Sequence, residues 1–265
     1  MNYYDYHMHS SFSTDGKASM VEMIEKSIDL GLKEICFTDH VDYGIFTDDS
    51  FMVDLDDYSK KIDELKTRYK SKISIQKGIE FGLQSDLSDY YRDRAHKYDF
   101  DFIICSIHAI DRMDLYMGSY FEGKSQVEIY ENYYNELLQV VKTYKDYSVL
   151  GHLDLIKRYA PFDTYLEDEM FHDIISEILK QAIYDGKGIE INTSSYKYKL
   201  PDLTPSRYIL KLYKELGGEI ITTGSDSHRT SEIACEFDYI YSYLKEIGFN
   251  YITRFEQMKP EFIKI

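Results

Sequence analysis

The stretch YDYHMHSSFSTDG, residues 4–16, joins a short run of aromatic residues to two histidines and an aspartate. Alternate side chains of a β-strand point to the same side of the sheet. His7 and His9 can therefore face one side together while Met8 turns away, and Asp15 follows in the next loop. Two imidazoles at the end of one strand predict a metal site, provided that other strands bring further ligands to the same place.

Six further apolar runs of strand length follow the first one along the chain. Each is rich in Ile, Val, Phe, Tyr or Thr, which is typical of buried strands. Together with residues 3–7, the runs cover residues 34–40, 73–81, 100–108, 147–153, 188–194 and 219–226. Stretches with helical periodicity alternate with them, over residues 19–30, 55–70, 86–97, 124–145, 166–185, 205–216 and 231–247. Seven strand–helix units in series predict an α/β fold with a parallel sheet, closed into a barrel with one unit fewer than the (β/α)₈ form.

The chain is predicted to form a single domain over residues 1–265, because no repeat and no linker rich in Pro, Gly or Ser interrupts the alternation. Two longer connections, residues 41–54 and 109–123, are predicted to be loops at the rim of the barrel. The C-terminal stretch FNYITRFEQMKPEFIKI, residues 249–265, could close the barrel or form a contact between subunits. The sequence therefore leaves the oligomeric state open.

The composition argues against several classes of partner. With 31 basic and 47 acidic residues the net charge is −16, which argues against binding to nucleic acid or to an anionic membrane surface. No run approaches the roughly 20 apolar residues of a membrane-spanning helix, and the N-terminus does not resemble a signal peptide. The three cysteines show no paired spacing, so we expect a cytoplasmic protein, with Cys36 and Cys105 buried in apolar strands.

Six of the eight histidines lie at or just after the end of a predicted strand. They are His7, His9, His40, His108, His152 and His228. Parallel strands in a barrel present their C-terminal ends at one rim, where active sites are built. Asp15, Glu80 and Asp226 occupy similar positions, while Asp39 is expected to orient a ligand histidine. Imidazole nitrogens combined with carboxylate oxygens form a typical ligand set for a transition metal.

Each of these motifs alone has a simpler explanation. A single HxH or SDSH is common in turns, and Glu80 by itself could pair with a lysine. The combination, in which each motif ends its own strand, indicates a metal site.

The motifs, in order, are HMH at 7–9, DG at 15–16, TDH at 38–40, GIEFG at 78–82, CSIH at 105–108, GHLD at 151–154 and GSDSH at 224–228. This series resembles that of the PHP (polymerase and histidinol phosphatase) superfamily over nearly the whole chain. The segments GHLDLIKRY, EINTS and LYKELGGEIITTGSDSH are similar to those of the monofunctional histidinol-phosphate phosphatases.

The resemblance implies a distorted, TIM-like (β/α)₇ barrel that holds three divalent transition-metal ions at the C-terminal ends of its strands. The first ion would bind His7, His9, Glu80 and Asp226, the second Glu80, His108 and His152, and the third Asp15, His40 and His228. Zn²⁺, Mn²⁺ and Fe²⁺ all suit these ligands. The implied activity is that of a histidinol-phosphatase, a phosphomonoesterase of histidine biosynthesis that hydrolyses L-histidinol phosphate to L-histidinol and phosphate.

Such a centre would make hydroxide from a bridging water, and this hydroxide would attack phosphorus in line with the leaving alcohol. Cationic side chains would then be needed to bind the phosphate. Arg158, Lys197 and Arg207 follow predicted strands and are candidates, with Arg158 favoured because a guanidinium binds phosphate through two hydrogen bonds.

The leaving alcohol also needs a proton, and Asp15, His228 and Asp42 are the candidate donors. Recognition of the imidazole and the ammonium group would require carboxylates on the rim. Asp42 and Glu122 are candidates for that contact.

Three other functions share part of this motif series. A PHP-type phosphoesterase could act on another substrate, namely a phosphodiester, a nucleotide or phosphotyrosine. A metal-binding module without catalysis would be expected to show a degenerate ligand set, whereas here every expected ligand position has a suitable side chain. An amidohydrolase-like barrel shares the opening HxH but usually has a metal-bridging lysine, which no predicted strand end supplies here.

Overall fold

The computed structural model describes residues 2–45 and 53–265, and it contains the seven strands that the sequence predicts. In spatial order they are β1 (Tyr4–Met8), β2 (Glu34–Phe37), β4 (Ser74–Gly82), β5 (Phe102–Ser106), β8 (Val149–Leu150), β9 (Gly188–Asn192) and β10 (Ile221–Gly224). Neighbours in this order pair in parallel. A short additional strand, β3 (His40–Val41), also pairs in parallel with β4.

The two ends of this order meet and nearly close the sheet into a barrel. The amide of His9 donates to the carbonyl of Ser227 at 2.9 Å, and the amide of Asp226 donates to the carbonyl of His7 at 2.8 Å. β1 carries one extra residue relative to β2 over residues 5–8, and such a bulge bends the strand and increases its twist. The predicted distorted (β/α)₇ barrel is therefore confirmed.

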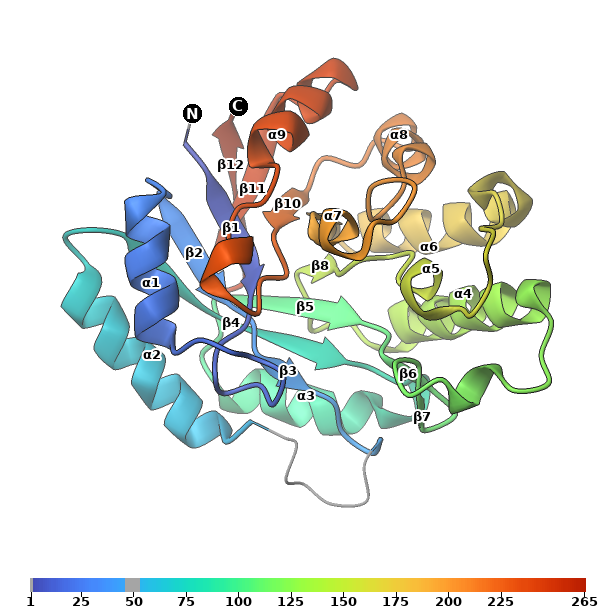
Figure 1. Ribbon diagram of the computed structural model, residues 1–265, viewed down its shortest axis with the longest axis horizontal. Coiled ribbons are helices and arrows are strands. Elements are labelled where there is room, and N and C mark those ends of the chain that lie inside the picture. The colour runs from blue at the N-terminus through green and yellow to red at the C-terminus, as the bar shows by residue number, and fades with distance from the viewer. Residues whose placement is uncertain (1, 46–52) are drawn as a thin grey trace.

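Helices cover the outside of the barrel (Figure 1). They are α1 (Met20–Asp29), α2 (Leu55–Tyr69), α3 (Ser88–Lys97), α4 (Gln126–Thr143), α5 (Ile156–Tyr159), α6 (His172–Tyr184), α7 (Ser194–Tyr198), α8 (Arg207–Glu215) and α9 (Phe237–Glu246), with 3₁₀ turns η2 (Ser85–Leu87), η3 (Ser119–Phe121), η4 (Asp168–Phe171) and η5 (Thr230–Glu232). Ser19 and Ser125 begin α1 and α4 with capping boxes that Glu22 and Glu128 complete. These caps satisfy backbone amides that the first helical turn leaves without partners.

A hairpin that the sequence did not predict fills the N-terminal end of the barrel. Its strands are β11 (Tyr251–Glu256) and β12 (Lys259–Lys264), which lie close to the start of β1 (Figure 1). Phe255 packs against Phe102 with ring centroids 5.1 Å apart, and its amide donates to the Tyr6 hydroxyl at 2.9 Å. Of the two roles predicted for this stretch, the structure shows the first, because the hairpin closes the N-terminal end of the barrel.

The opposite end of the barrel is left for polar side chains and rim segments. The predicted rim loop 109–123 contains a small hairpin, β6 (Ala109–Ile110) with β7 (Met113–Asp114), followed by η3. Residues 46–52 of the predicted rim loop 41–54 lie outside the described residues.

Two further predictions concern the burial of the cysteines and the presence of membrane-spanning helices. Cys36 and Cys105 are buried and unpaired, as predicted. Within residues 2–45 and 53–265, no helix is both long and apolar enough to span a membrane.

Candidate metal centre

The side chains predicted as metal ligands meet at the C-terminal ends of the barrel strands. Imidazole and carboxylate atoms form four groups of three, and within each group the atoms lie within 4.8 Å of one another. The groups are His7, His9 and Asp226; His7, Glu80 and His152; His40, Glu80 and His108; and His9, His40 and His228. Glu80 and three of the histidines belong to two groups each, whereas the predicted ligand sets share only Glu80.

His7 and His9 face each other as the alternation of strand side chains predicts. Their Nε2 atoms are 3.1 Å apart, and Asp226 Oδ1 lies 3.3 Å from His9 Nε2 and 3.7 Å from His7 Nε2. Two imidazole nitrogens this close to each other and to a carboxylate oxygen can act as ligands of one ion. This donor arrangement fits a bound divalent ion.

Glu80 lies at the centre of the cluster and is completely buried. Its Oε1 atom is 2.9 Å from His152 Nε2 and 3.3 Å from His108 Nε2. Its Oε2 atom is 3.0 Å from His40 Nδ1 and 3.1 Å from His7 Nε2. Each oxygen therefore faces two imidazoles, which is the geometry expected of a carboxylate that bridges two ions.

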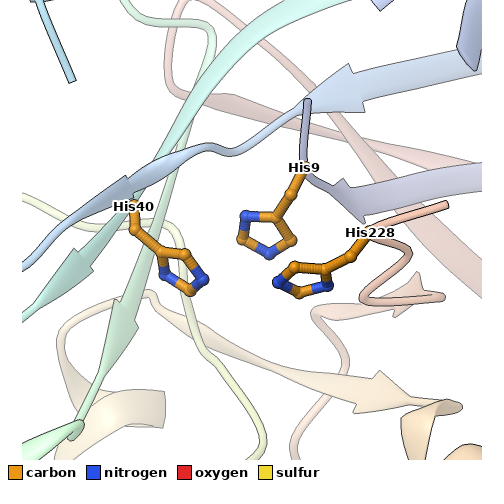
Figure 2. Close-up of side chains that lie close together, drawn as sticks. All are labelled: His9, His40 and His228. Atoms are coloured by element: carbon orange, nitrogen blue, oxygen red, sulfur yellow. The ribbon is translucent and has the colours of Figure 1, made fainter. Parts of the chain in front are cut away.

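The third group lies nearer to solvent. His9, His40 and His228 point toward one another (Figure 2), and the ring of His9 stacks on those of His40 and His228 with centroids 4.1 and 4.2 Å apart. Asp15 Oδ2 is 2.8 Å from His228 Nε2 and 3.7 Å from His40 Nε2. The Asp15 side chain is 54% exposed, so this edge of the cluster is open to solvent.

The charges of two members of the cluster, His9 and Glu80, suit metal ligands. Burial, reinforced by the neighbouring His40 and His228, holds the pKa of His9 well below its usual range, so this imidazole stays neutral. Burial raises the pKa of the Glu80 carboxyl, but the surrounding histidines outweigh burial and hold that pKa well below its usual range. Neutral imidazole and ionised carboxylate are the protonation states that bind a metal ion.

His40 gives the metal-free protein a predicted dependence on pH. Burial lowers the pKa of His40, but Glu80, Asp42 and Asp15 outweigh burial and raise it to about 9. Because the folded pKa exceeds the unfolded value of about 6.5, protonated His40 stabilises the fold fully below pH 6.5, and this stabilisation is lost as the pH rises toward 9. The unfolding temperature of the metal-free protein is therefore expected to fall between pH 6.5 and 9.

Thermal unfolding with a chelator, and again with Zn²⁺ or Mn²⁺, would measure this effect. The metal-loaded protein should lose less stability over that range, because a ligand histidine has already released its proton. Parallel pH profiles with and without metal would contradict the prediction. Metal-free His40→Gln should show a weaker fall than the parent protein.

Sequence reasoning missed several side chains that orient the ligands. Glu190, on β9, accepts a hydrogen bond from His7 Nδ1 at 2.6 Å. Ser106, at the end of β5, donates to Glu80 Oε1 at 2.6 Å. An available signal for Glu190 was a carboxylate in the middle of the apolar run GIEIN, the same pattern that singled out Glu80 in GIEFG.

Asp39 acts on the histidines through a serine. Its Oδ1 atom accepts a hydrogen bond from the hydroxyl of Ser13 at 2.7 Å, and that hydroxyl lies 3.4 Å from His9 Nδ1. The predicted role of Asp39 in orienting a ligand is therefore an indirect one.

Two of the predicted phosphate-binding cations lie beside the cluster. Arg158 is almost buried, donates from Nη2 to Asp226 Oδ2 at 3.1 Å and bonds Ser194. Its Nε atom is buried and has no hydrogen-bond partner among the described residues. Lys197 Nζ is 3.2 Å from Glu232 Oε2, which also accepts the amide of His228 at 2.9 Å.

The other three candidates have different surroundings. Arg207 pairs with Asp202 and donates to the Tyr239 hydroxyl at 2.8 Å, away from the ligand cluster. Glu122 is exposed after η3, and within the described chain it contacts none of the ligands. Asp42 Oδ1 lies 2.8 Å from His108 Nδ1, so this carboxylate contacts a predicted ligand histidine.

Comparisons with known proteins agree with this geometry. The model of the PHP domain family matches residues 5–194. The chain is 32% identical to a histidinol-phosphatase of Lactococcus lactis over 257 residues, which cover 96% of this chain and 95% of the relative. It is also 32% identical to a probable histidinol-phosphatase of Clostridium acetobutylicum over 240 residues, 88% of this chain and 89% of the relative.

A solved structure extends the comparison to three dimensions. The crystal structure of histidinol phosphate phosphatase from Lactococcus lactis, complexed with zinc, L-histidinol and phosphate, superposes with a TM-score of 0.90 at 31% identity. The match covers 98% of this chain and 99% of that one.

Proposed function

The chain belongs to the PHP domain family, and from this premise we propose that it hydrolyses L-histidinol phosphate to L-histidinol and phosphate. The observation that carries the proposal is the convergence of the whole imidazole and carboxylate set beside a buried arginine, in a barrel that matches a histidinol phosphate phosphatase over nearly its full length. The protein is thus a phosphatase, and its substrate is a small phosphate ester.

The enzyme uses divalent metal ions, and we propose three of them, with Zn²⁺, Mn²⁺ or Fe²⁺ in each position. His7, His9, Glu80 and Asp226 would hold the first, Glu80, His108 and His152 the second, and Asp15, His40 and His228 the third. When bound, such ions lower the pKa of a water molecule toward neutrality and neutralise the oxygens of the phosphate.

The chain's own side chains would complete the reaction. The Arg158 guanidinium, held by Asp226 and partly covered by the Tyr198 ring 4.3 Å away, would donate to phosphate oxygens from its free Nε. Lys197 would add a second positive charge at the His228 side. The leaving alcohol would take up its proton at the solvent-exposed edge beside Asp15 and His228, relayed through water, because both side chains bind the third ion without a proton of their own to give.

Phosphate release tests the proposal directly. Protein reconstituted with Mn²⁺ or Zn²⁺ is expected to hydrolyse L-histidinol phosphate with a kcat/KM at least about tenfold above that for other phosphomonoesters, dinucleotides and a phosphotyrosine peptide. Tenfold corresponds to roughly 1.4 kcal/mol of preferential transition-state binding. Weak and even turnover across these substrates would support a metal-dependent phosphatase but contradict L-histidinol phosphate as its substrate. A preference for a diester or for phosphotyrosine would assign that compound as the substrate instead.

Removal of the metal ions is expected to abolish phosphate release and to destabilise the fold. A ligand present at a thousand times its Kd adds about 4 kcal/mol to the stability of the native state. For a chain of this length that amounts to roughly 10 °C in unfolding temperature. Differential scanning calorimetry before and after dialysis against a chelator would measure the shift, and readdition of Zn²⁺ or Mn²⁺ should reverse it. An unchanged unfolding temperature would contradict metal binding at this site.

We also infer that the enzyme is cytoplasmic and that residues 1–265 form one domain. Unpaired cysteines support the first inference, and the second is supported by a single sheet order that runs from β1 to β10 with β11 packed beneath it. A single calorimetric transition would agree with one domain, whereas two separable transitions would contradict it.

A further inference from the structure

Two of the ligand histidines are each held by a carboxylate that is not itself one of the proposed ligands. Glu190 Oε1 lies 2.6 Å from His7 Nδ1, and Asp42 Oδ1 lies 2.8 Å from His108 Nδ1. In both histidines the second ring nitrogen, Nε2, faces Glu80 inside the cluster. The two pairs therefore share one arrangement, in which a carboxylate contacts Nδ1 and leaves Nε2 directed at the proposed ions.

A glycine makes room for each of these carboxylates. A Cβ atom added at Gly224 would lie 2.2 Å from Glu190 Oε1, and one added at Gly82 would lie 1.8 Å from Asp42 Oδ1. Real Cβ atoms essentially never come this close to another heavy atom, so no larger residue fits at either glycine without displacing the carboxylate. The two glycines thus leave the space that the carboxylate–histidine pairs occupy.

Glu190 makes further contacts that Asp42 lacks. It is 1% exposed, and its Oε2 accepts the amide of His152 at 3.0 Å and Asn192 Nδ2 at 3.1 Å. One carboxylate therefore fixes a side chain of the first proposed ligand set and the backbone of a ligand in the second. Asp42 is more exposed, since its side chain retains 22% of its accessible surface.

We propose that Glu190 and Asp42 are positioning residues of the metal centre, and this inference rests on the proposed metal ligands. Each carboxylate accepts the Nδ1 proton of its histidine, which fixes the tautomer whose Nε2 lone pair binds the ion. Glu190 has the larger effect because it is buried and holds ligands of two ions. Asp42 then acts on His108 instead of serving as the substrate contact or proton donor that the sequence suggested.

Glu190→Gln tests the role with little change in volume. One oxygen becomes an amide NH₂, which must face either His7 Nδ1 or the His152 amide, and both positions require an acceptor. Loss of an outer contact to a metal ligand typically weakens metal affinity by about 10- to 100-fold. We expect a loss of this size for one ion of the centre in chelator competition, with reduced metal content after gel filtration and with kcat affected more than KM.

Glu34→Gln is the matched control. Glu34 is also a buried carboxylate, but it lies at the opposite end of the barrel, where it bonds Tyr6, Ser74 and Gln76. This change should lower the unfolding temperature and leave metal affinity unchanged. Asp42→Asn is the second variant, with a smaller expected loss of roughly 3- to 10-fold, below the usual range because water can partly replace its contact.

Three results would overturn the proposal. The first is parental metal affinity and kcat in both Glu190→Gln and Asp42→Asn. The second is equal metal loss in Glu190→Gln and Glu34→Gln, because the effect would then follow general destabilisation. The third applies if Glu190→Gln does not fold, and it is a metal affinity of Asp42→Asn equal to that of the parent protein. Chelator competition needs no substrate, so failure of the parent protein to hydrolyse L-histidinol phosphate would count against the proposed function and leave this test intact.

Discussion

Glu80→Gln is expected to lower kcat/KM for L-histidinol phosphate by at least about a thousandfold. Both carboxylate oxygens face two imidazoles each, and an amide offers only one oxygen acceptor in their place. A metal ion at the reacting phosphate contributes several kcal/mol to the transition state, and about 4 kcal/mol corresponds to a thousandfold change in rate. Loss of a carboxylate that bridges two ions should therefore remove most of the activity.

Metal content and phosphate release, measured on the same preparation, would check this result. The variant should bind at least one ion fewer than the parent protein and keep the parental circular dichroism spectrum. Glu177→Gln is a suitable control, because Glu177 pairs with Lys142 on the surface and its removal should change neither quantity. Parental metal content together with parental kcat in Glu80→Gln would contradict a bridging role.

Arg158→Ala is expected to lower kcat/KM by roughly 100- to 1,000-fold while the metal content stays the same. Removal of one preorganised donor to a developing negative charge typically has an effect of this size. Arg158 is nearly buried beside Asp226, so its guanidinium is held in place before a ligand arrives. Arg158→Lys should recover only part of the activity, because lysine keeps the charge but lacks the planar donor pair.

Arg207→Ala is the matched control for the arginine. Arg207 was also a candidate for phosphate binding, but its guanidinium pairs with Asp202 and contacts Tyr239 instead. We expect activity within about twofold of the parent, as is usual for an exposed ion pair. Equal losses of activity in Arg158→Ala and Arg207→Ala would contradict phosphate binding by Arg158. Loss of metal in Arg158→Ala would also contradict it, and would indicate that Arg158 holds Asp226 in place instead.

Much of the fold could be predicted because strands and helices leave different periodicities in the chain. The run ISIQKGIEF predicted a strand over 73–81, and β4 covers Ser74–Gly82. The run 147–153 was less well predicted, since β8 covers only Val149–Leu150 before the chain turns at the rim. YITRFE alternates like a strand, but its partner KPEFIK is mostly exposed and carries no apolar pattern. The hairpin of β11 and β12 was missed because of this second strand.

The convergence of the proposed ligands was predictable for a related reason. In a parallel barrel, a residue at the end of any strand lies at the same rim, so position along the chain is enough to place it. His7, Glu80 and Asp226 could therefore be grouped from sequence although the first and the last lie 219 positions apart. Asp42, Glu122 and Arg207 could not be placed in this way, because they lie beyond the barrel strands, and the path of the following loop or helix sets their direction.

Local sequence thus carries the alternation of strands and helices, the sites of the ligand histidines and the chemistry of their side chains, since each depends on residue type and spacing. Tertiary structure decides which atoms meet. Glu190 reaches His7 only because Gly224, from a third strand, leaves space beside both. Such contacts depend on the packing of three strands at once, and the spacing within any one strand does not contain that information.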